Sequence, residues 1–118
     1  MTSATAATVR VDVLIPMTNP HIDISWDPAK AETNLSKHGI AFSEAAEVLI
    51  DRLALSVFDA SHSQAEERWF TLGETVAGRL LAVSHTFVTH SAETATVRIM
   101  SAREATRAER CQYRDEPR

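Results

Sequence analysis

The sequence predicts a single α+β domain in which a mostly antiparallel sheet is combined with helices. Residues 26–39 have the start and stop signals of a short helix, and residues 101–114 have the start signal and charge pattern of a last helix. Between them, short segments alternate apolar and polar residues and are separated by turn residues, which is typical of hairpin-connected strands. From residue 21 onward the predicted order is β-α-α-β-β-β-β-α.

Composition and charge fit one small soluble domain. The 118 residues are too few for two cores, and 44% hydrophobic with 24% charged residues is ordinary for a globular protein. A formal net charge of -4 argues against non-specific nucleic-acid binding through bulk positive charge. The single cysteine, Cys111, excludes an internal disulfide and fits a reducing compartment. No run of about 18 apolar residues occurs, so we expect a cytoplasmic protein with no membrane span.

The first 20 residues are predicted to form a tail outside the domain. Residues 2–8 are only Thr, Ser and Ala, and two prolines interrupt the short alternating segment that follows them. Met17 lies just before the first organised segment, which raises the hypothesis that translation starts there. We therefore expect residues 1–20 to be disordered or upstream of the true start, and residues 21–116 to form the domain.

A short helix with little apolar surface is the best-defined element. Asp27 is a good N-cap, Pro28 occupies a position where a missing N–H costs nothing, and Gly39 supplies the left-handed residue that ends the helix. At about 100° per residue, one sector of this helix carries hydrogen-bond donors where a core-facing stripe is usual. That sector consists of Lys30, Asn34, Lys37 and His38.

Periodicity predicts the strands and a second helix. Residues 22–26 alternate apolar and polar side chains and are predicted to form a strand that runs into the helix cap. Ser43 is the predicted N-cap of the second helix. The apolar face of that helix is predicted to consist of Phe42, Ala46, Leu49 and Ile50. The remaining strands are predicted at residues 54–58, 68–72, 79–88 (buried on both faces at Leu80–Val83) and 94–100.

The last helix is predicted to begin at a capping box, in which Ser101 and Glu104 satisfy each other's backbone N–H groups. Four arginines follow nearly in line along one side. They could bind phosphate, but a solvated face paired with Glu104 and Glu109 is the more ordinary interpretation of charged residues on a helix. The four are Arg103, Arg107, Arg110 and Arg114.

Several other side chains could do chemistry, and each has a structural alternative. Histidine suits acid–base catalysis, but His38 also fits as the positive charge at the end of the first helix. Arg98 belongs either to an exposed sheet surface or to a charged site, and Glu67 and Arg68 supply charge at a strand start. The five histidines lack metal-ligand spacing and no glycine-rich phosphate loop occurs. Neither a metal nor a cofactor is therefore expected.

Four segments stand out in combination: WDPAKAETNLSKHGIAFSEAAEVL, ERWFTLG, GRLLAVSHT and RIMSAREATRAERCQY. They resemble the BrnT toxins of bacterial type II toxin-antitoxin pairs, over nearly everything from Ile24 to Tyr113. The resemblance implies a RelE-like fold and an endoribonuclease that arrests growth. It also implies neutralisation by a BrnA-like antitoxin with a ribbon-helix-helix domain, which alone contacts operator DNA, and a toxin dimer within a heterotetramer.

Cleavage of RNA without a metal requires a base for the 2′-hydroxyl proton, cations for the phosphorane charge and an acid for the leaving oxygen. His38 is the predicted acid or base, and Asn34 and Glu67 are predicted to orient their neighbours. Tyr113 is either a further site residue or an anchor of the last helix. The predicted catalytic set is His38, Lys30, Lys37, Arg68, Arg98 and Arg103, and the substrate-binding set is Asn34, Glu67, Arg107, Arg110 and Tyr113.

One position departs from the family pattern. Relatives usually carry an arginine in a T-x-R sequence after the strand that ends near Thr86, and Val88 stands at that place here. This departure favours an alternative function, a catalytically degenerate toxin that binds its antitoxin and acts as an operon co-repressor.

Overall fold

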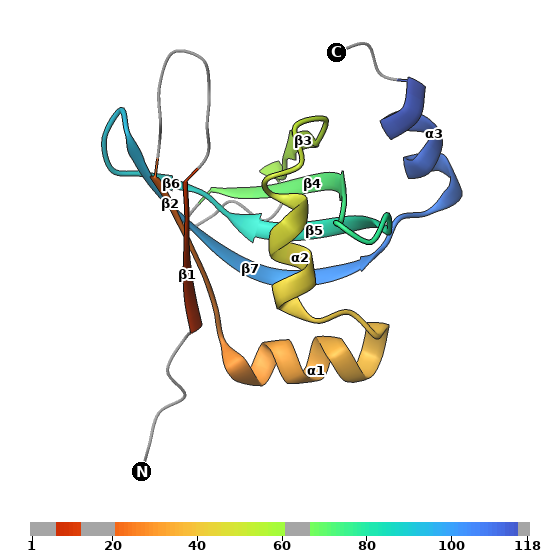
Figure 1. The fold of residues 1–118 in the computed structure, drawn as a ribbon, viewed down its shortest axis with the longest axis horizontal. Coiled ribbons are helices and arrows are strands. Elements are labelled where there is room, and N and C mark those ends of the chain that lie inside the picture. Colours follow the sequence, from red (N-terminus) through yellow and green to blue (C-terminus); the bar gives the residue numbers. More distant parts are fainter. Residues whose placement is uncertain (1–6, 13–20, 61–66, 116–118) are drawn as a thin grey trace.

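The structure, a computed structural model, describes residues 7–12, 21–60 and 67–115 (Figure 1). Three helices accompany seven strands in this part of the chain. The elements are, in chain order, β1 (Ala7–Asp12), β2 (His21–Trp26), α1 (Pro28–His38), α2 (Phe42–Val48), β3 (Leu55–Phe58), β4 (Arg68–Glu74), β5 (Leu80–Thr86), β6 (Val88–Thr89), β7 (Thr94–Glu104) and α3 (Arg107–Asp115).

The strands form one sheet in the order β1-β2-β7-β5-β4-β3, and β6 pairs with β7. All pairs are antiparallel except β2 with β7, which are parallel. The predicted α+β class with a mostly antiparallel sheet and a C-terminal helix is therefore confirmed. β7 is the central strand, since it pairs with β2, β5 and β6.

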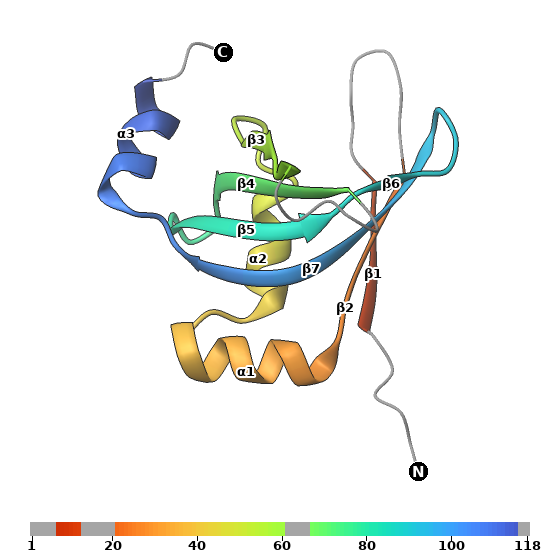
Figure 2. The ribbon, with the colours of Figure 1, turned by 180° about the vertical axis from the view of Figure 1, so that it is seen from behind.

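The two faces of the sheet carry separate apolar clusters. Leu81 and Val83 of β5 pack with Phe42 and Val48 of α2, whereas the alternate residues Leu80 and Ala82 pack in the cluster that contains Tyr113 of α3. Successive side chains of a strand point to opposite faces, so α2 and α3 cover opposite faces of the sheet (Figures 1 and 2). The predicted burial of β5 on both faces is confirmed.

The first helix has the predicted boundaries. Asp27 accepts a hydrogen bond from the backbone N–H of Ala29 at 2.9 Å, and Gly39 adopts a φ of 70° immediately after His38. Asn34 is the one buried residue of this helix. α1 lies along the last part of β7 (Figures 1 and 2). Because its buried residue is polar, the attachment of the helix depends on polar contacts more than on an apolar face.

The second helix differs from the prediction at its start and in its buried face. It begins at Phe42, with Ala41 as an N-cap that makes no side-chain cap bond, so the prediction of Ser43 as the cap is wrong. Phe42 is buried, together with Ala45 and Val48, whereas Ile50 is 45% exposed. Burial of Phe42 against the sheet therefore sets the helix start, and tertiary packing overrides the local preference of serine for caps.

The prediction of a capping box at Ser101 and Glu104 is also wrong. β7 continues to Glu104, because Ala102 is buried and its neighbours remain in register with β5. The capping box lies five residues later. The Thr106 N–H donates to Glu109 Oε1 at 2.8 Å, and the Glu109 N–H donates to Thr106 Oγ1 at 3.2 Å. Arg103 is consequently a strand residue, and the remaining arginines of the predicted stripe lie on α3.

Part of the predicted tail has regular structure. Ala7–Asp12 forms β1, which pairs antiparallel with β2 in a register that joins Ala7 to Trp26 and Asp12 to His21. β1 provides hydrogen-bond partners for the backbone N–H and C=O groups at the outer edge of β2. Residues 1–6 and 13–20, and with them the hypothesis about Met17, lie outside the described residues.

Gly73 of β4 permits a close approach between the sheet and α2. A Cβ atom added at Gly73 would lie 2.8 Å from Val48 Cγ1 and 3.0 Å from the Val48 carbonyl oxygen. Both distances are shorter than ordinary van der Waals contact, so α2 would have to move to accommodate any side chain.

We expect Gly73→Ala to lower the free energy of unfolding by about 1–3 kcal/mol, through overpacking against Val48. Chemical denaturation measures this value. In a Val48→Ala background the same change should cost less, because the new methyl group enters space that the valine has vacated. Additive effects of the two substitutions would contradict this account of the contact.

Candidate functional site

Three arginines lie on the face of the sheet that carries α3. Val97 and Ile99 belong to the core under α1 and α2, so Arg98 between them points to the opposite face. Arg68 is paired with Thr86, whose Oγ1 accepts the Arg98 backbone N–H at 3.0 Å, so Thr86 of β5 lies between the two arginines. The third is Arg103, on β7. We call Arg68, Arg98 and Arg103 the arginine face.

A β-bulge in β7 allows Arg98 and Arg103 to share a face. Residues five apart on a regular strand point to opposite sides. The pairing moves from His85–Ile99 to Ser84–Ser101, so β7 contains one extra residue at Met100. After this bulge Ala102 points into the core and Arg103 points out, which restores the arginine to the same side as Arg98.

Glu109 holds Arg103 in a two-point ion pair. Arg103 Nη1 donates to Glu109 Oε1 at 2.8 Å and Nη2 donates to Oε2 at 3.0 Å. The guanidinium also lies over the Phe70 ring, 5.2 Å from its centroid. The hydrogen bonds from Arg103 are the largest cause that lowers the pKa of Glu109 to about 2, and they raise the pKa of Arg103. Both groups are therefore charged at neutral pH.

The predicted donor stripe of α1 is only partly exposed. Lys30, Lys37 and His38 are exposed and line a groove of about 300 Å³ that also includes Met100 and Ser101 of β7. We call it the α1 groove. Ser101 pairs with Ser84 on the arginine face, so this groove opens toward that face. The structure thus brings three residues of the predicted catalytic set, Lys30, Lys37 and His38, to the border of the arginine face.

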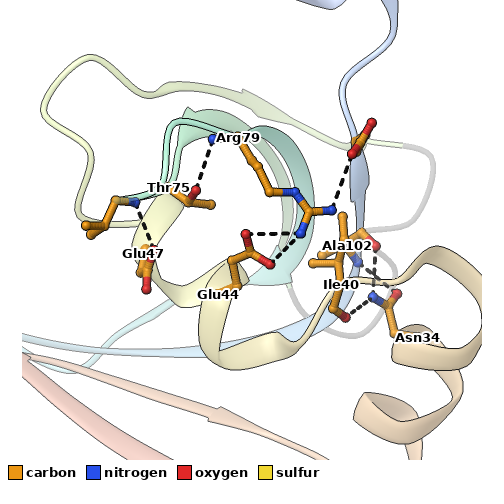
Figure 3. A network of polar contacts seen from close by, with 9 residues as sticks. Asn34, Ile40, Glu44, Glu47, Thr75, Arg79 and Ala102 are labelled. Carbon is orange, nitrogen blue, oxygen red and sulfur yellow. Dashed lines mark hydrogen bonds and ion pairs between the residues drawn. The ribbon is translucent and has the colours of Figure 1, made fainter.

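Asn34, the fourth residue of that stripe, is buried and bonded to the backbone (Figure 3). Its Nδ2 donates to the carbonyl oxygens of Ile40 at 3.0 Å and Ala102 at 2.9 Å, and its Oδ1 accepts the Ala102 N–H at 3.0 Å. Neither amide hydrogen remains for a substrate. Asn34 therefore attaches α1 to β7 through hydrogen bonds, which differs from the substrate-binding role predicted for it.

The other predicted residues have separate surroundings. Tyr113 is buried and its hydroxyl donates to Asp51 Oδ2 at 2.5 Å, which matches the alternative of a helix anchor. Glu67 accepts a hydrogen bond from Trp69 Nε1 at 3.2 Å. Arg107 is exposed and Arg110 half-buried on α3, away from the groove beside α1.

A second ion-pair cluster joins the start of β5 to α2 and β7 (Figure 3). Arg79 Nη1 lies 3.0 Å from Glu44 Oε1, and Nη2 lies 3.3 Å from Glu104 Oε2. Arg79 was not among the residues predicted from the sequence to act in the site. Since both partners are carboxylates on neighbouring elements, this cluster has a structural role.

A buried chain of hydrogen bonds that contains His85 was likewise not predicted from the sequence. His85 Nδ1 contacts the Thr86 carbonyl oxygen at 2.9 Å and must donate to it, so Nε2 accepts from Thr71 Oγ1 at 2.7 Å. Thr71 in turn lies 2.8 Å from Ser56 Oγ. Burial is the main cause that lowers the pKa of His85, so its imidazole is neutral. Its place in the apolar β5 run was the signal that it would be buried.

The described part of the chain contains neither a metal-binding cluster nor a membrane-spanning helix. No group of three or more His, Cys, Asp or Glu residues within residues 21–60 and 67–115 could hold a metal ion. No helix among the described elements is long and apolar enough to cross a membrane.

Comparison with known proteins decides the family. A family model described as the ribonuclease toxin BrnT of type II toxin-antitoxin systems matches residues 26–109. The chain belongs to the BrnT family. The matched region runs from Trp26 before α1 to Glu109 in α3, and it contains the arginine face, the α1 groove and the capping box. Membership of a type II toxin-antitoxin family implies an antitoxin partner.

A solved structure supports the same assignment. The chain is similar to the crystal structure of the Brucella abortus ribonuclease toxin BrnT, with 25% sequence identity and a TM-score of 0.50. The similarity covers 70% of this chain and 94% of that chain. The RelE-like fold implied by the sequence is therefore confirmed. No curated protein matches the chain.

We expect Asn34→Ala to lower the free energy of unfolding by about 3 kcal/mol, because it leaves three buried backbone groups without partners. Urea denaturation provides the measurement. Thr33→Ala, an exposed change on the same helix, is the matched control and should cost less than about 0.5 kcal/mol. A loss below about 1 kcal/mol for Asn34→Ala would show that the Asn34 hydrogen bonds contribute little to the free energy of unfolding.

The Arg103–Glu109 pair should make stability depend on acid pH. Because the folded pKa of Glu109 is depressed from 4.5 to about 2, its contribution is complete above pH 4.5 and disappears as the pH falls toward 2. After allowance for solvent screening, we expect Glu109→Gln to cost about 1–2 kcal/mol at pH 7 and almost nothing near pH 2. Urea denaturation across this range measures the difference. The exposed Glu32→Gln is the control, and a pH-independent effect of Glu109→Gln would contradict this expectation.

Proposed function

We propose that the chain is a metal-independent endoribonuclease toxin, and that RNA binds across the arginine face and the adjoining α1 groove. The observation that supports this proposal is the gathering of Arg68, Arg98 and Arg103 on one face of three adjacent strands in a protein with a net charge of -4. A local concentration of guanidinium groups in an acidic protein suits a phosphate backbone.

In the proposed reaction the 2′-hydroxyl of RNA attacks the adjacent phosphorus, so no protein nucleophile is required. Arg68 and Arg98 stabilise the charge that develops on the phosphorane oxygens. His38 is exposed at the rim of the α1 groove, where it takes the hydroxyl proton or protonates the leaving 5′-oxygen. Lys30 and Lys37 hold the flanking phosphates, and Arg103, oriented by Glu109, binds at the other side of the face.

The proposal extends to partners. A BrnA-like antitoxin with a ribbon-helix-helix domain neutralises the toxin in the cytoplasm, and operator DNA is contacted only through that antitoxin. The toxin forms a dimer within the heterotetramer.

Val88 favours the second candidate function, a degenerate toxin that binds the antitoxin without cleaving RNA. Val88 pairs with Thr96, which lies on the same face of β7 as Arg98 because the two are two positions apart on the strand. An arginine at Val88, as the family resemblance leads one to expect, would therefore extend the arginine face. Here that place is taken by a valine that is 37% exposed.

We expect the purified chain to cleave RNA in EDTA, and Arg98→Ala or His38→Ala to reduce the rate by about 10²–10³-fold, because each removes transition-state stabilisation or proton transfer. Arg52→Ala, at an exposed arginine in the turn before β3, is the matched control and should retain the rate.

Val88→Arg should increase the cleavage rate if the arginine face is the site. Cleavage that persists in Arg98→Ala and His38→Ala would contradict the assigned site. Absence of cleavage together with a stable antitoxin complex would support the binding module.

A further inference from the structure

A second groove lies between α3 and the β3–β4 edge of the sheet, on the same face as the arginines. Its volume is about 400 Å³. Val57, Phe70 and Leu72 supply apolar walls, and Glu109 and Gln112 line it from α3. Phe70 connects this groove to the arginine face, because its ring lies beneath the Arg103 guanidinium. We call it the α3 groove.

We propose that the α3 groove holds one unpaired base of the RNA substrate and disfavours uracil. This inference rests on the proposed function, since it names the part of the nucleotide that lies beside the arginine face. It assigns Phe70 to the binding of the base and Gln112 to the selection between bases.

The charges of the groove exclude phosphate as its occupant. Asp59 and Glu109 both line it, and Glu109 is anionic at neutral pH. A phosphate would be repelled by these carboxylates, whereas the guanidinium groups that attract it lie on the neighbouring arginine face. A nucleotide that spans both surfaces would therefore place its phosphate among the arginines and its uncharged base in the α3 groove.

The walls suit a planar aromatic ring. Single-stranded RNA is commonly recognised through unstacked bases that lie against aromatic rings or arginine planes. The α3 groove offers the Phe70 ring with Arg103 over it, and Val57, which is 53% exposed, at the outer edge. Stacking of this kind accepts every base, so it explains binding but not selection.

Selection comes from the polar groups at the rim. Gln112 is exposed and its amide can donate and accept together, as in bidentate contacts to adenine. A carboxylate such as Glu109 accepts hydrogen bonds from exocyclic amino groups. Adenine, cytosine and guanine each carry such a group next to a ring nitrogen that accepts, so one base can donate to a carboxylate and accept from the Gln112 amide. Uracil offers a single donor, N3–H, flanked by two carbonyl oxygens that would lie against the carboxylates. The groove should therefore bind uracil more weakly than the other three bases.

Binding tests this inference independently of catalysis. Four 2′-O-methyl oligonucleotides that differ in one base cannot be cleaved by 2′-hydroxyl attack, so affinity is measured even if the chain has no nuclease activity. We expect the oligonucleotide with uridine at the varied position to bind the full chain with a dissociation constant roughly tenfold higher than those of the other three. A factor of this size is typical of the loss of one base contact. Fluorescence anisotropy gives the dissociation constants.

We expect Gln112→Ala to reduce the discrimination against uridine to about twofold, and Phe70→Leu to weaken binding of all four oligonucleotides. Gln112 is an exposed helix residue, so its replacement keeps the test valid if Phe70→Leu fails to fold. Arg114→Ala, the neighbouring α3 position that does not line the groove, should leave the discrimination unchanged.

Equal binding of the four oligonucleotides by the unmodified chain, or an unchanged preference in Gln112→Ala, would overturn the inference. Loss of antitoxin binding in Gln112→Ala with an unchanged base preference would assign the groove to the protein partner instead, and would also overturn it. Cleavage of RNA in EDTA is measured separately, so failure of the groove assignment is distinguishable from failure of the proposed function.

Discussion

The extra residue in β7 is the constraint on which the arrangement of the site depends. One inserted residue at Met100 changes the parity of the strand, so that Val97, Ile99 and Ala102 all point into one core. Without it, Ala102 would leave the core and Arg103 would point beneath α2. The bulge therefore satisfies the packing of α1 and α2 and places Arg98 and Arg103 together on the opposite face.

The same bulge explains why α1 needs few apolar residues. Ala102, immediately after the bulge, exchanges two backbone hydrogen bonds with the Asn34 amide, while Met100 and Ser101 line the groove beside the helix. A buried amide that makes all of its hydrogen bonds fixes the position of the helix against the strand. The exposed side of α1 is therefore not needed for this attachment and carries Lys30, Lys37 and His38. The helix is attached by hydrogen bonds, and its surface is available for charge.

The sequence predicted those features that depend on local signals. The ends of α1 follow from Asp27 and Gly39, and the two-sided burial of β5 follows from an uninterrupted apolar run. The last helix shows where local signals are insufficient. Both Ser101 to Glu104 and Thr106 to Glu109 fit the capping-box pattern. Only the pairing of β7 with β5 decides between them.

Side-chain roles were harder to predict because they depend on the fold as a whole. Asn34 belongs to a helical stripe with two lysines and a histidine, and nothing in that spacing indicates that it alone turns toward β7. The bulge at Met100 has no composition signal, so the common face of Arg98 and Arg103 could not be derived from their separation. The polar chain through His85 depends on strand register, which places Thr71 and Ser56 beside it.

The α3 groove keeps a defined width because α3 is attached at both of its ends. At its start, Glu109 bonds the Thr106 N–H and the Arg103 guanidinium, which connects the helix cap to β7. Near its end, Tyr113 donates to Asp51, whose Oδ2 also accepts the Glu74 N–H at 2.8 Å. One carboxylate therefore joins the end of α3 to β4. Since Phe70 and Leu72 lie on that same strand, both walls of the groove are fixed relative to each other before any ligand enters, which reduces the entropic cost of binding.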